Sequence, residues 1–147
     1  MKFKIELARQ GNFIFAVLMI HFLFFGYICL YFEEGVGLRI LYLYQVLFSR
    51  RTFFSFIILF AIVFFMAYRE HFFEYGIRNS IWLTLIIIIE SWIWYWFING
   101  FEFVKIGEFF TNYRGYLTIF SLLGINIFSA ILAAIIKQKY ESKSKIK

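Results

Sequence analysis

The sequence predicts an all-α protein with four transmembrane helices in a small bundle, and its composition supports this fold class in two ways. Its 147 residues are 63% hydrophobic, 25% aromatic and only 16% charged, and its mean hydropathy is +0.77. A soluble domain is nearer half apolar and a quarter charged. One small core cannot hide this much apolar surface, so we expect the surrounding solvent to be lipid. Proline is absent, which permits long uninterrupted helices.

Four apolar runs have the length that a bilayer-crossing helix needs, which is about 20 residues. They cover residues 13–32, 52–68, 80–98 and 116–136. The first run follows the basic segment MKFKIELAR, as in a signal peptide, but it ends in FEEGVG without a small-residue cleavage site. We therefore interpret it as a retained helix. No internal repeat or linker divides the chain, so residues 1–147 are predicted to form one domain.

The connections on one side of the predicted bundle are unusual. Residues 36–48 (VGLRILYLYQVLF) join spans one and two, and residues 101–110 (FEFVKIGEFF) join spans three and four. Both are too apolar for water and too short to cross a bilayer. We predict that they are interfacial amphipathic or shallow re-entrant segments at the headgroups. The basic tail, residues 137–147 (KQKYESKSKIK), is expected to be freely solvated.

The basic residues predict the orientation, because cytoplasmic connections have an excess of lysine and arginine. With four spans, ten basic residues fall on the side of both termini and five on the other. Both termini are therefore predicted to be cytoplasmic, with the protein in a bacterial-type plasma membrane, the cell inner membrane. Arg50 and Arg51 fall on the outer side, against this trend. A fifth crossing at residues 36–48 would bring them inside, but that segment contains Arg39 and is too short to cross.

Three of the four spans have one strongly polar side chain near their midpoint: His21, Glu90 and Asn126. A carboxylate at a helix centre costs about 2.5–3.5 kcal/mol on insertion scales, so Glu90 is expected to take up a proton or to face a partner. His21 could share that proton, and Asn126 could donate amide hydrogens. Small residues three, four and seven positions after Asn126 favour an inward-facing amide. We predict a midplane polar cluster that binds a proton or a substrate; the alternative is a structural cluster that holds three helices in register.

Trp92 is a further candidate for the site. The other tryptophans, Trp82, Trp94 and Trp96, fall near the ends of the third span, where aromatic residues anchor helices at membrane interfaces. Trp92 is deeper, and beside Glu90 it could present a substrate-facing ring to a cation or a sugar. Membership of the aromatic belt is the alternative interpretation.

Several kinds of chemistry are not expected. All nine acidic residues are glutamates, which excludes an aspartate nucleophile or metal ligand. Cys29 is the single cysteine, so no internal disulfide is predicted. In residues 69–76 (REHFFEYG), His71 and Glu74 are three positions apart, but two ligands do not make a metal site, and we expect a solvated turn. No metal, cofactor or catalytic residue is predicted, nor is binding to nucleic acid, because the basic residues lie at segment ends.

Two functions fit these features. The first is a small membrane protein that assists translocation of a solute or lipid-linked substrate, as a homo-oligomer or as a subunit of a larger membrane complex, since four helices alone enclose little volume. The alternative is a non-transporting accessory or immunity-type protein that binds a larger membrane complex or a toxin. Membrane lipids are expected partners in both. An enzyme is not expected, because no pair of catalytic groups is evident outside the midplane cluster.

Overall fold

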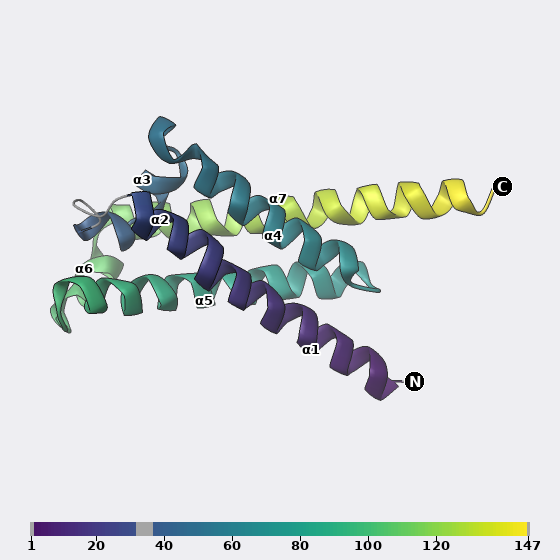
Figure 1. Ribbon diagram of the computed structural model, residues 1–147, viewed down its shortest axis with the longest axis horizontal. Helices are drawn as coiled ribbons and strands as arrows, with labels where there is room; N and C mark the ends of the chain where they lie inside the picture. The colour runs from purple at the N-terminus through teal and green to yellow at the C-terminus, as the bar shows by residue number, and fades with distance from the viewer. Residues whose placement is uncertain (1, 32–36, 147) are drawn as a thin grey trace.

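The chain is helical along nearly all of its described length. The computed structural model describes residues 2–31 and 37–146, and 90% of these residues are helical, with no strand among them. Four helices are long and apolar enough to cross a membrane, which confirms the predicted all-α class and the number of long helices (Figure 1). The first long helix consists of α1 (Lys2–Met19), η1 (Ile20–Phe25) and α2 (Gly26–Tyr31), and the others are α4 (Phe53–Arg69), α5 (Phe73–Asn99) and α7 (Tyr113–Ser144).

The observed helices extend beyond the predicted apolar runs at the end of the bundle where both termini lie (Figure 1). Helix α5 begins at Phe73, whereas the apolar run begins at residue 80. Helix α7 continues to Ser144, so most of the basic tail is helical, although it is exposed after Lys137. Lysine, glutamine and glutamate favour helix, and no proline interrupts the segment.

The first long helix contains one turn of π-helix, η1, with six residues. Ala16, Ile20, Phe24 and Ile28 recur every four residues along this helix and are all buried. In a regular α-helix, which has 3.6 residues per turn, such a stripe would drift around the axis. The wider i→i+5 turn of η1 compensates for that drift and keeps the stripe against the bundle. The same turn includes His21.

Helix α7 is the centre of the bundle. It packs along both α4 and α5, while the first long helix runs beside α4, its main contact, and crosses α5 and α7 at an angle (Figure 1). The buried face of α7 includes a run of small residues, Ser129, Ala130 and Ala133. Such residues let neighbouring helix backbones approach closely.

Residues 37–52, before α4, close the end of the bundle opposite the termini. They contain η2 (Gly37–Ile40), α3 (Leu43–Leu47) and η3 (Arg50–Thr52). The side chains of Ile40, Leu41, Leu43 and Leu47 are almost completely buried. At the start of α4, Thr52 Oγ1 donates a hydrogen bond of 2.5 Å to the Val46 carbonyl oxygen. This connection is therefore folded into the helical core.

The second apolar connection contains α6 (Val104–Thr111), which has a different environment. Phe103 and Val104 are more than 70% exposed, whereas Phe109 is fully buried and its ring stacks at 6.0 Å on Tyr42. The buried ring of Phe109 therefore anchors α6 on the bundle. Gly115 at the start of α7 permits this contact, because a Cβ there would lie 1.8 Å from the Phe109 carbonyl oxygen.

Candidate functional site

The π-helical turn of the first long helix brings His21 against Glu90 of α5. His21 Nδ1 and Glu90 Oε2 are 3.3 Å apart, across 69 positions of sequence. The His21 side chain is 44% exposed and that of Glu90 is 13% exposed. Turns of π-helix inside α-helices are rare, and those that occur often lie at functional sites. Two of the three predicted midplane residues therefore form a direct pair.

Aromatic and aliphatic side chains surround this pair. The Trp94 ring is 5.4 Å from the His21 ring, and its indole nitrogen is buried without a hydrogen-bond partner among the described residues. Phe22 and Ile89, which adjoin the two members of the pair in sequence, are 69% and 50% exposed. The pair thus lies at the surface of the bundle, inside an apolar belt.

The pair can hold no proton, one proton or two, and these states differ in charge. With one proton it is neutral overall, either as a carboxylic acid beside a neutral imidazole or as an ion pair. Losing that proton leaves a net negative charge, and gaining a second leaves a net positive charge. An unpaired charge in apolar surroundings is costly. Each proton exchange at the pair would therefore change the local charge.

Asn126, the third predicted residue, does not contact the His21–Glu90 pair and instead contacts Thr84 of α5. It is fully buried, and its Nδ2 donates to Thr84 Oγ1 at 2.8 Å and toward the Ser80 carbonyl oxygen at 3.4 Å. Thr84 precedes Glu90 by six residues on α5, which is about 9 Å along the axis and about a third of a turn around it. The Asn126 contact joins α7 to α5, whereas the His21–Glu90 contact joins η1 to α5. Counting to the span midpoints therefore did not show that Asn126 contacts a different level and a different face of α5 from His21.

Trp92 contacts aromatic residues of α6. Its ring meets Phe109 and Phe110 edge to face at 5.6 and 5.7 Å. Its indole nitrogen is buried and has no hydrogen-bond partner within the described part of the chain. Trp92 therefore anchors α6 on α5, although it is only two positions from Glu90.

A second polar cluster surrounds Glu70 in the short connection between α4 and α5. We expected a solvated turn here, and His71 and Glu74 are indeed exposed, but the Glu70 residue is only 5% exposed. Asn79 Nδ2 donates to Glu70 Oε1 at 3.3 Å, and the Asn12 side chain also hydrogen-bonds to Glu70. Lys137 Nζ of α7 donates to the Glu70 carbonyl oxygen at 2.5 Å. This residue thus ties three long helices together at the end where the termini lie.

Burial raises the pKa of the Glu70 carboxyl above its ordinary value of 4.5, because desolvation disfavours the charged form. The Asn12 hydrogen bond and the positive charge of Arg9 oppose part of that rise. A sequence signal for this cluster exists: Asn12 and Asn79 are amides at the ends of two predicted spans that meet on the same side. It was missed because charged residues in a short turn are usually solvated.

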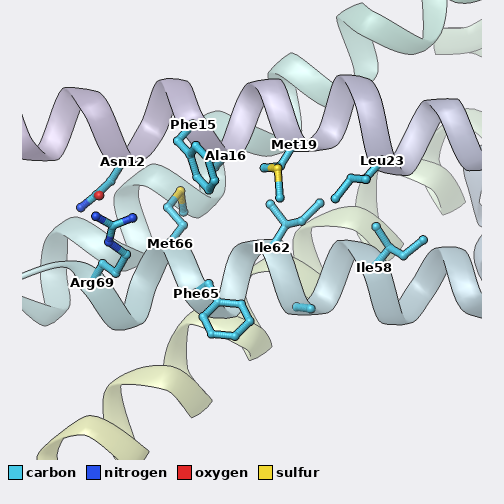
Figure 2. A pocket seen from close by; sticks show the side chains of 11 residues that line it. Asn12, Phe15, Ala16, Met19, Leu23, Ile58, Ile62, Phe65, Met66 and Arg69 are labelled. Atoms are coloured by element: carbon cyan, nitrogen blue, oxygen red, sulfur yellow. The ribbon is translucent and has the colours of Figure 1, made fainter.

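A groove with a volume of about 380 Å³ lies between the first long helix and α4. Asn12 and Arg69 face each other at one end of it (Figure 2). The remaining wall is apolar along two turns of each helix: Phe15, Ala16, Met19, Leu23, Ile58, Ala61, Ile62, Phe65 and Met66. A long hydrocarbon chain with a polar group at its end matches this distribution of polarity.

Metal binding has no support from the side chains in the described ranges. Within residues 2–31 and 37–146, no group of three or more histidine, cysteine or glutamate side chains could hold a metal ion.

No protein family, curated protein or solved structure matches the chain. The function must therefore be inferred from the geometry of the molecule.

Proposed function

We propose that this protein is integral to a bacterial-type plasma membrane, with both termini cytoplasmic, and assists translocation of a lipid-linked substrate or another solute. It acts as a homo-oligomer or as a subunit of a larger membrane complex. The four long apolar helices and the bias of basic residues toward the terminal side support this placement. In it, α6 lies at the outer interface, and the buried segment around α3 is a shallow re-entrant element.

The observation that supports transport best is the His21–Glu90 pair on the π-helical turn. Ionisable residues inside membrane spans are costly and typically serve proton or ion movement. In our proposal, the neutral one-proton state holds the first long helix against α5. Gain or loss of a proton changes the local charge and weakens this contact, so the first long helix moves relative to its neighbours.

The groove between the first long helix and α4 favours a lipid-linked substrate over a purely water-soluble one. Its wall is apolar, and its polar end has a fixed cation, Arg69, and an amide, Asn12 (Figure 2). Met19 and Leu23 on this wall flank His21 in sequence, so the helix that bears the proton-binding pair also forms half of the groove. Movement of that helix would therefore couple proton exchange to the shape of the groove.

The decisive experiment compares Glu90→Gln with Glu108→Gln, a control at an exposed glutamate that pairs with Lys105 at 2.7 Å. Each variant is reconstituted in liposomes that contain a fluorescently labelled phospholipid, and movement of the label between leaflets is followed across a pH gradient. We expect wild type and Glu108→Gln to accelerate this movement in a pH-dependent way and Glu90→Gln to lose at least tenfold in rate. Helical circular dichroism verifies folding. Equal rates in all three proteins would rule out the proposed role of the pair.

A second candidate function rests on an exposed face of the first long helix. Ile14, Leu18 and Phe22 follow one another at intervals of four residues and are 58%, 49% and 69% exposed, next to the half-exposed His21. This stripe would fit a helix of a larger complex or of a toxin, with the pair acting as an interface contact in an accessory or immunity-type protein. Native mass spectrometry after mild extraction separates the two functions. A discrete heteromer that survives Glu90→Gln would favour the accessory role.

A further inference from the structure

Two arginines from different helices share one aromatic ring at the end of the bundle where the termini lie. The guanidinium carbon of Arg9, on α1, is 4.7 Å from the centre of the Tyr75 ring, and that of Arg78, on α5, is 5.0 Å from it. The two guanidinium carbons are therefore less than about 10 Å apart. The contact with the ring face offsets part of the mutual repulsion of the cations. An anion bound between the two guanidinium groups would offset the remaining repulsion.

Both arginines line the same cavity, which has a volume of about 410 Å³. Gln10 contributes an amide to its wall, and Trp82, which is 57% exposed, borders it. Phe13 and Ile14 supply the apolar part of the wall. The cavity therefore combines two cations, a hydrogen-bonding amide and an apolar side.

No acidic side chain neutralises this pair of cations directly. Within the described ranges, the ion pairs closer than 4 Å are His21–Glu90 and Lys105–Glu108. Glu70 attracts Arg9 at longer range, but its carboxyl accepts hydrogen bonds from the asparagines described above. Glu74 is one turn before Arg78 and exposed, and it makes no ion pair with it. A positive site thus remains open toward the cavity.

We propose that this cavity binds the headgroup of an anionic glycerophospholipid of the cytoplasmic leaflet. Arg9 and Arg78 hold the phosphate with charge-assisted hydrogen bonds, Trp82 lies at the level of the glycerol, and Phe13 and Ile14 contact the start of an acyl chain. Charge complementarity and the apolar side of the cavity select a lipid over a free anion. The inference rests on the membrane placement proposed above but not on the His21–Glu90 pair.

The test is native mass spectrometry of the full chain in mild detergent, titrated with phosphatidylglycerol or with phosphatidylcholine of the same acyl chains. Loss of one charge-assisted contact weakens binding by about tenfold. We expect wild type to prefer phosphatidylglycerol by at least about tenfold and Arg9→Gln/Arg78→Gln to lose this preference. The matched control, Arg50→Gln/Arg51→Gln, removes two positive charges from exposed arginines at the other end of the bundle. This variant should keep the preference for phosphatidylglycerol.

Each alternative result overturns the assignment. Equal loss in both double variants would mean a general charge effect, and no preference in wild type would mean no site. Displacement of phosphatidylglycerol by inorganic phosphate at millimolar concentration would mean a site for free phosphate. If the double variant fails to fold, Arg78→Gln alone decides, because Arg78 is exposed and lacks contact with Glu70; an unchanged preference in that variant overturns the site.

The Glu90→Gln variant separates this inference from the proposed function. We expect it to keep the preference for phosphatidylglycerol even if lipid movement is lost. A wild-type protein that retains neither lipid and partitions into water would overturn both the membrane placement and the lipid site.

Discussion

The Glu70 carboxyl, which accepts hydrogen bonds from α1 and α5, links the protonation of one group to the stability of the bundle. Its pKa in the folded protein is raised above 4.5, so the folded state keeps this proton over a pH range in which the unfolded chain has already lost it. Stability falls with rising pH wherever the folded state binds more protons. The contribution of Glu70 is therefore fully present below pH 4.5 and is lost as the pH rises through the higher folded pKa.

Replacement of Glu70 by Gln should remove this contribution to the pH dependence. We expect the free energy of unfolding of wild type, measured in detergent, to fall relative to that of Glu70→Gln as the pH rises from 4.5 through the folded pKa of Glu70. Glu74→Gln, in an exposed position on the next helix, is the control and should follow wild type. Parallel curves for wild type and Glu70→Gln would contradict the argument.

At the residue scale, the sequence suggested the pairing of His21 with Glu90 but not the contact of Asn126 with Thr84. Counting to span midpoints brings His21 and Glu90 to one level, and the structure places them 3.3 Å apart. The same count could not show that Asn126 faces Thr84, because the facing side depends on the rotation of each helix in the bundle. The burial of Glu70 was also beyond prediction, since its partners come from three separate helices.

Gly115 determines how closely α6 can approach α7. A methyl group at this position would lie 1.8 Å from the Phe109 carbonyl oxygen, which is backbone and cannot rotate away. Gly115→Ala should therefore push α6 outward and expose Phe109, which is fully buried and packs against Trp92. Overpacking of this kind costs about 1–3 kcal/mol and occasionally more.

The measurement for Gly115→Ala is thermal unfolding in detergent together with tryptophan fluorescence. We expect a lower melting temperature and a red-shifted emission, because Trp92 loses its aromatic cover. Gly107→Ala is the matched control within α6, since a Cβ there meets nothing within 4 Å. A Gly115→Ala protein as stable as Gly107→Ala would show that the backbone adjusts without loss of packing.

At the scale of elements, the number and approximate positions of the long helices followed from hydropathy alone. The π-helical turn did not, because its residues, IHFLFF, are compatible with an ordinary helix. It arises from the requirement that a four-residue stripe stay on one face over three turns, which is a property of packing. The burial of Leu43 and Leu47 likewise depends on the gap that the surrounding helices leave at that end of the bundle.

The arrangement of the whole molecule allows a direct test of its proposed orientation. Both termini lie at one end of the bundle (Figure 1), and ten of the fifteen basic residues belong to that side in the four-span arrangement. We expect green fluorescent protein fused after the last residue to fluoresce and alkaline phosphatase fused there to be inactive. A phosphatase fused after Gly100, beyond α5, should be active. The reverse pattern would invert the proposed topology.

Helix α7 has 32 residues, so its axis is about 48 Å long at 1.5 Å per residue. The hydrocarbon core of a bilayer is about 30 Å thick, and in the proposed placement about a third of the helix would project from it. The tail would then act as a stiff spacer and not as a flexible tether. Whatever binds the lysines near its tip would be held at a set height above the bilayer, in an orientation dictated by the bundle itself.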